Sequence, residues 1–203
     1  MVNITKNLIT CSFYQNENTQ DYIVIHDTGN TDSGSSALAT RNYFSNPVNK
    51  VSAHYIVDNK IIIQAVEEKN GAWHCGDGAG RYGINNRNSI GIEICVNKGG
   101  DYPTALKNAQ ELVVSLLLKY NHRPNIVVRH YDASKKNCPA SMNLDKKWTA
   151  WTEFQAEILF QYSVAKLVQK KVISSPDYWL QHANDVYSTE YVKKLIQNMA
   201  IIL

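Results

Sequence analysis

Residues 127–141, VVRHYDASKKNCPAS, place an imidazole and a thiol eight positions apart, at His130 and Cys138. Such a pair in a loop allows three interpretations: half of a metal site, a thiol–imidazole nucleophile pair, or a loop without chemistry. Pro139 follows the cysteine directly and has no backbone N–H, so a thiolate stabilised at a helix N-terminus is disfavoured. A metal site and an inert loop remain as the alternatives.

A second histidine, His26, ends the apolar run YIVIH, as His130 ends the run NIVVRH. In open α/β sheets, sites gather at the carboxyl ends of strands. Two imidazoles and the Cys138 thiolate would supply three ligands of the types that zinc prefers, and the fourth position would stay open for water. This pattern favours a catalytic zinc, although any single histidine at a strand end is more often a structural residue.

Glu93 interrupts the otherwise apolar stretch IGIEICV. A buried carboxylate is costly unless it is paired, so it is explained either by an ion pair or an edge position, or by a role as general base beside a metal-bound water. Lys136 lies two residues before Cys138 and would be close enough to stabilise a developing oxyanion, although a loop lysine is usually just solvated.

The elements that must position these residues follow from hydrophobic periodicity. The pattern predicts buried strands at 22–26, 89–97 and 125–130, a hairpin about Asp58-Asn59, and helices at about 35–44 and 102–121. Strand, helix and strand over residues 89–130 imply a right-handed βαβ crossover. We therefore expect an α/β fold, a mixed central β-sheet flanked by helices.

The C-terminal part is predicted to be helical. Apolar residues from Trp148 to Val168 keep a helical period, and Asp145 is placed to cap that helix. A further start signal at Ser175-Pro176 precedes a last amphipathic stretch, which contains Val192, Leu195, Ile196 and Met199. We expect a main domain over residues 1–158 and a helical appendage over 159–203, either packed on that domain or acting as a small binding module.

Composition excludes several classes of protein. The 203 residues are 44% hydrophobic and 19% charged, as in globular proteins, and a net charge of +3 is too mild to predict nucleic-acid binding. The sequence has no apolar run long enough for a transmembrane helix and no basic region followed by an apolar core, so we expect no stable membrane association and no signal peptide. The scattered cysteines, Cys11, Cys75, Cys95 and Cys138, do not form a disulfide scaffold.

Five segments in order, IVIHDTGN, SAHYIVD, WHCGDG, NRNSIGIEIC and HYDASKKNCP, resemble the zinc-dependent N-acetylmuramoyl-L-alanine amidases. This family includes phage amidase lysins, bacillus-type autolysins and animal peptidoglycan recognition proteins. The resemblance covers about residues 20–150. It implies the amidase fold, one zinc ion per chain, and hydrolysis of the bond between N-acetylmuramic acid and L-alanine in bacterial peptidoglycan.

The resemblance also implies roles for single residues. His26, His130 and Cys138 match the zinc ligands, Glu93 matches the catalytic glutamate, and Lys136 matches the lysine credited with stabilising the transition state. Another branch has a catalytic tyrosine directly before the histidine that corresponds to His54, and here that position is Ala53. The loss of that tyrosine leaves Glu93 as the expected base.

Four further residues are expected to line the substrate cleft: His54, Trp73, His74 and, as a weaker candidate, Asn88. Packing in the core or the hairpin is the alternative for the first three, and Asn88 could merely start a strand. A non-catalytic wall-binding module is the main rival function, and the retained Cys138 argues against it. We expect a phage or prophage endolysin made in the bacterial cytoplasm and released to the wall, with a leaderless autolysin as the alternative.

Overall fold

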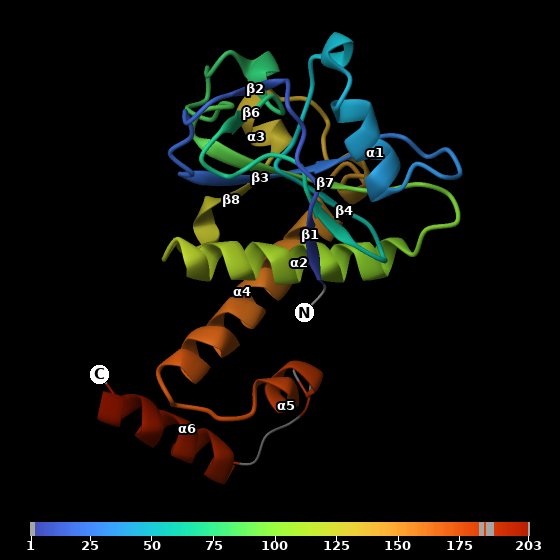
Figure 1. The fold of residues 1–203 in the computed structure, drawn as a ribbon. Helices are drawn as coiled ribbons and strands as arrows, with labels where there is room; N and C mark the ends of the chain where they lie inside the picture. Colours follow the sequence, from blue (N-terminus) through green and yellow to red (C-terminus); the bar gives the residue numbers. More distant parts are fainter. Residues whose placement is uncertain (1–2, 183–184, 186–188, 203) are drawn as a thin grey trace.

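The computed structural model describes residues 3–182, 185 and 189–202, and it has the expected α/β architecture (Figure 1). A six-stranded sheet has the strand order β1-β5-β4-β7-β3-β8. Its strands are β1 (Ile4–Lys6), β3 (Tyr22–Asp27), β4 (Tyr55–Val57), β5 (Ile62–Gln64), β7 (Ser89–Ile94) and β8 (Val127–Arg129). A separate antiparallel pair joins β2 (Phe13–Tyr14) to β6 (Gly71–Ala72).

The central sheet is mixed, as the sequence predicts. β3 pairs in parallel with both β7 and β8, and β7 pairs in parallel with β4. Only the predicted hairpin, β4 and β5 about Asp58-Asn59, pairs antiparallel within this sheet. The strand–helix–strand order over residues 89–130 is confirmed, and β3 lies between the two strands that the helix connects.

Two long helices cover one face of the sheet, and two shorter helices lie on the other (Figure 1). α2 (Tyr102–Lys119) and α4 (Thr149–Gln169) pack against a large apolar core, and α1 (Ala37–Phe44) packs on the opposite side (Figure 1). The short helix α3 (His130–Ser134) follows β8 directly and lies on the same side as α1. Four 3-10 turns complete the described connections, at Pro47–Asn49, Gly76–Gly78, Pro124–Ile126 and Ala140–Met142.

Local sequence explains where the long helices begin. α2 has Asp101 as N-cap, whose side chain accepts the backbone N–H of Thr104, and Pro103 lies in its first turn as predicted. The expectation that Asp145 is the N-cap of the next helix is wrong. α4 begins at Thr149 after Trp148, which has a left-handed backbone, and Asp145 instead accepts the Lys147 N–H and the Thr149 hydroxyl.

The C-terminal segment is helical, as expected, with α5 (Pro176–Gln181) and α6 (Thr189–Ile202) after α4. The expected division between residues 158 and 159 falls inside α4, which continues without a break from Thr149 to Gln169. Ile158 belongs to the large apolar core, and Tyr162 and Ala165 pack against that core, so the helix packs on the main domain on both sides of that division. In the part of the chain that the structure describes, no helix is long and apolar enough to cross a membrane.

Candidate active site and metal centre

The register of two parallel strands places His26 beside Glu93. The two residues are direct partners in the pairing of β3 with β7. Side chains alternate along a strand, and Ile25 and Ile92 point into the core under α2 and α4, so His26 and Glu93 point to the opposite face. The alternation of side chains along two paired strands therefore brings a candidate ligand and a candidate base together on one face.

The loop from His130 to Cys138 returns the chain to the same point. His130 begins α3 directly after β8, which neighbours β3. The Tyr131 N–H donates to the Cys138 carbonyl at 3.0 Å, which closes the loop. The Cys138–Pro139 peptide bond is cis. Asp27, the residue after His26, accepts the Ser141 N–H at 2.7 Å and ties this loop to the end of β3.

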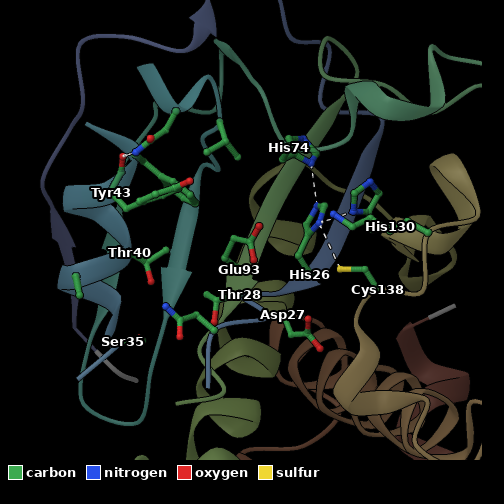
Figure 2. A pocket seen from close by; sticks show the side chains of 16 residues that line it. His26, Asp27, Thr28, Ser35, Thr40, Tyr43, His74, Glu93, His130 and Cys138 are labelled. Carbon is green, nitrogen blue, oxygen red and sulfur yellow. Dashed lines mark hydrogen bonds between the residues drawn. The ribbon is translucent and has the colours of Figure 1, made fainter. Parts of the chain in front are cut away.

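The three predicted ligands meet at one point, with His26, His130 and Cys138 facing one another (Figure 2). The Nδ1 atoms of the two histidines are 3.1 Å apart, and Cys138 Sγ is 3.8 Å from His26 Nδ1. Tetrahedral zinc would separate two nitrogen ligands by ~3.3 Å and a nitrogen from a sulfur by ~3.6 Å. The donor types and their spacing therefore fit a zinc ion, and all three residues are buried.

The environment keeps both imidazoles neutral. Burial, followed by the neighbouring His74 and His130, holds the pKa of His26 well below its usual range. Burial also lowers the pKa of His130, against the opposing effect of Asp77. Neutral imidazole is the form that binds a metal. Burial raises the pKa of the Cys138 thiol, so its thiolate needs a compensating cation, which disfavours a free cysteine nucleophile.

Glu93 lies beside this cluster with one unsatisfied oxygen. Its Oε2 atom is buried and has no hydrogen-bond partner among the described residues. Burial, followed by the nearby Asp27, raises the pKa of Glu93 to about 8, and Lys136 opposes the shift. A carboxyl group that lacks a partner and has a raised pKa is suited to exchange protons with a ligand in the site.

A cavity of about 740 Å³ opens over the cluster. His26, His74, Glu93, His130, Lys136 and Cys138 line its inner side. The opposite wall comes from α1 and its flanking loops, with Ser35, Thr40 and Tyr43 (Figure 2). Asn30 and Asn49 complete that wall. Lys136 is exposed at the cavity, and the α1 wall carries neutral polar and aromatic groups, so an extended polar substrate can lie between them.

The structure brings His74, but not the other three expected substrate-binding residues, to this cavity. His54 is fully buried, where its Nε2 donates to the Asn70 carbonyl at 2.8 Å and its Nδ1 accepts the Gly91 N–H at 2.9 Å. The Trp73 ring packs on Tyr14, with ring centroids 5.6 Å apart. These contacts correspond to the packing alternative for both residues.

Asn88 also lies away from the cavity. Its side-chain amide donates to the Gly83 carbonyl, and its Oδ1 accepts the Asn85 N–H, both at 2.8 Å. The residue therefore closes the turn that leads into β7, which corresponds to the structural alternative considered for it.

Sequence reasoning missed Asp77, whose Oδ1 is 2.7 Å from His130 Nε2. The only local signal is its place in WHCGDG, three residues after His74. Its partner is 53 positions away along the chain, so no spacing rule predicts the contact. Asp27 was missed as well, although it directly follows a predicted ligand.

Comparisons with known proteins agree on one family. A sequence profile described as N-acetylmuramoyl-L-alanine amidase matches residues 16–141. The chain is 41% identical over 137 residues to the N-acetylmuramoyl-L-alanine amidase XlyA of Bacillus subtilis, a match that covers 68% of this chain and 43% of XlyA. It is 38% identical over 148 residues to the Bacillus subtilis amidase CwlH, with 70% of this chain and 57% of CwlH covered. The chain thus spans about half the length of these relatives.

Solved structures give the same result. The catalytic domain of XlyA superimposes with a TM-score of 0.69 at 38% identity, covering 77% of this chain and 99% of that domain. The Staphylococcus aureus hydrolase AmiA, only 19% identical, superimposes with a TM-score of 0.66 over 85% of this chain and 87% of AmiA, and supports the fold alone.

Proposed function

The chain belongs to the N-acetylmuramoyl-L-alanine amidase family, and on this basis we propose that it hydrolyses the amide between N-acetylmuramic acid and the L-alanine of the peptidoglycan stem peptide. The observation that carries the proposal is the meeting of His26, His130 and Cys138 beside Glu93 in one open cavity. A merely wall-binding relative would need neither an intact ligand set nor an unpaired carboxyl group beside it.

His26, His130 and Cys138 would hold one zinc ion, the cofactor of this proposal. Zinc in such a site polarises a carbonyl oxygen and acidifies a bound water. The three side chains project from β3, from the start of α3 and from the loop after it, so the fold and not a single motif sets their positions.

Glu93 is the proposed general base. Its unpartnered Oε2 can accept a proton from the attacking water and later return it to the amine of the departing L-alanine. The raised pKa supports the second step in particular, because a carboxyl group that holds its proton near neutral pH is also a competent acid.

Lys136 is the proposed oxyanion stabiliser. Its side chain lines the cavity, and its charge reaches both His26 and Glu93, since it lowers the pKa of each. A cation at that point would offset negative charge that develops on the carbonyl oxygen of the scissile amide.

We propose bacterial peptidoglycan as the partner, in the setting of a phage or prophage endolysin, with a leaderless autolysin as the alternative. No role in nucleic-acid binding is proposed, in keeping with the mild net charge of +3. We assign catalysis to the main domain and leave wall binding or self-association as the two proposed roles of the helical segment from residue 159 onward.

Product analysis tests the reaction directly. Digestion of purified cell walls should release new amino groups that end-group analysis identifies as L-alanine, without an increase in reducing sugars. The Cys138→Ser variant, a matched control for the intact ligand set, should release far less. New reducing ends would indicate a glycosidase, and amino groups of other residues would indicate a peptidase.

A further inference from the structure

We infer that His74 and Asp77 are positioning residues that hold the two metal-binding histidines in one tautomer, with Nε2 protonated and Nδ1 free for the metal. The inference rests on the proposed zinc site and extends it to groups behind the ligands. Two separate hydrogen-bond chains carry it, one behind each histidine.

The series of hydrogen bonds behind His26 passes through His74 and Ser89 to a backbone carbonyl. His26 Nε2 is 3.0 Å from His74 Nδ1, and His74 Nε2 is 3.2 Å from Ser89 Oγ. The Ser89 hydroxyl donates to the Asn85 carbonyl at 2.6 Å. A carbonyl oxygen can only accept, so the single hydroxyl proton of Ser89 is committed to it and Ser89 must accept from His74.

The donor role of His74 Nε2 also fixes which nitrogen of the proposed ligand His26 carries its proton. Because His74 donates through Nε2, its Nδ1 in the neutral ring is an acceptor and takes the Nε2–H of His26. The His26 Nδ1 lone pair is then directed at the point where the ligands meet (Figure 2). Partners of this kind fix the orientation and tautomer of metal-bound histidines in general.

The hydrogen-bond series behind His130 is shorter and consists of a single contact. The Asp77 carboxylate, whose Oδ1 is 2.7 Å from His130 Nε2, can only accept when ionised. His130 therefore donates through Nε2 and also presents Nδ1 as a lone pair.

The two hydrogen-bond series together leave the Nδ1 lone pairs of His26 and His130 facing each other, with the two nitrogens 3.1 Å apart. Neither nitrogen carries a hydrogen in the neutral rings, so the contact is repulsive until a cation lies between them. The other tautomer of either histidine would put a hydrogen at the metal position. The hydrogen-bond network behind the ligands thus prepares the site for a metal before the metal binds.

Glycines in the backbone leave room for both positioning residues. A Cβ atom on Gly91 would lie 2.5 Å from His74 Cγ, so the absence of a side chain in the buried strand β7 makes room for the ring. The buried His54 accepts the Gly91 N–H and holds that strand in place. Gly78 likewise allows the turn that carries Asp77 to approach the Ala133 carbonyl closely.

Zinc affinity of the full-length protein, measured by competition with a chromophoric chelator, tests the inference. His74→Phe and Asp77→Ala remove the acceptors and should each weaken zinc binding by about 10–100-fold. His74→Gln and Asp77→Asn keep a carbonyl acceptor and should recover most of that loss. The control is His122→Gln, because His122 contacts the Gln20 carbonyl away from the site. Affinity within threefold of the parent in both His74→Phe and Asp77→Ala would overturn the inference.

Nitrogen-15 NMR of the unmodified zinc-loaded protein provides a readout that does not depend on variant folding. We expect Nε2–H signals from His26, His74 and His130, and a scalar coupling across the hydrogen bond from His26 Nε2 to His74 Nδ1. A proton on His74 Nδ1 would contradict the network. If these signals are found but wall digestion yields no L-alanine ends, the proposed function fails and the positioning inference stands.

Discussion

At the scale of single residues, the site depends on groups that are costly to bury and are left unpaired. Glu93 has a buried Oε2 atom without a partner among the described residues, and the Nδ1 atoms of His26 and His130 face each other. Each of these arrangements destabilises the metal-free fold, because buried polar groups without partners lose their hydration. Binding of a cation and of substrate would relieve this cost.

The Glu93 carboxyl should make the metal-free protein less stable as pH rises. Its pKa is about 8 in the folded chain, so between about pH 5 and 8 the unfolded chain releases this proton while the folded chain keeps it. Glu93→Gln has no such proton and should gain stability relative to the parent across that window, on the order of a few kcal/mol by pH 8. Urea unfolding of the chelated protein at pH 5 and pH 8 measures the difference.

The exposed Glu153 on α4 provides the matched control, since Glu153→Gln changes a carboxyl that water already surrounds. Equal stability changes at pH 5 and pH 8 in Glu93→Gln would show that burial does not shift this group. The zinc-loaded Glu93→Gln variant should also lose about 10²–10⁴-fold in wall hydrolysis if Glu93 is the base, with zinc content unchanged.

The sequence predicts the residues that meet at the site better than the residues that support them. His26 and Glu93 lie at definite places in apolar runs, and Cys138 follows in a recognisable loop, so residue types and strand ends already point to them. His74 was expected in the cleft and does line it, but its contact with His26 Nε2 spans 48 positions and depends on strand packing that no local pattern encodes.

At the scale of elements, hydrophobic periodicity predicts the sheet and both long helices because each strand and helix buries one face. Ile23 and Ile25 alternate with residues of the opposite face in β3, and the same alternation in β7 fixes which face carries Glu93. The division at residue 158 could not be placed from periodicity, since the helical period continues through it and α4 ends only at Gln169.

Truncation tests the importance of an unbroken α4. A chain ending at residue 173 keeps Tyr162 and Ala165, which pack against the large apolar core, and should unfold at nearly the same urea concentration as the full chain. A chain ending at residue 158 loses both contacts and should be less stable by on the order of 2 kcal/mol, because burying apolar surface contributes roughly 25 cal/mol per Å². Equal stability of the two truncated chains would show that the second half of α4 does not support the main domain.

At the scale of the whole molecule, the two faces of the sheet have different roles. The face under α2 and α4 holds the largest apolar core, whereas the opposite face carries His26, Glu93 and the cavity bounded by α1. The helices α5 and α6 lie at the far end of α4, away from the cavity (Figure 1). The larger core therefore lies entirely on the face away from the site, and the site shares its own face with two smaller apolar clusters.

We propose that one zinc ion, held by His26, His130 and Cys138, enables this chain to act as an amidase. The most direct measurement is the release of L-alanine amino ends from purified walls by the chelated protein, before and after one equivalent of zinc is added. We predict that chelation abolishes the release and that one equivalent of zinc per chain restores it. Undiminished release by protein that metal analysis shows to be free of zinc would contradict the account.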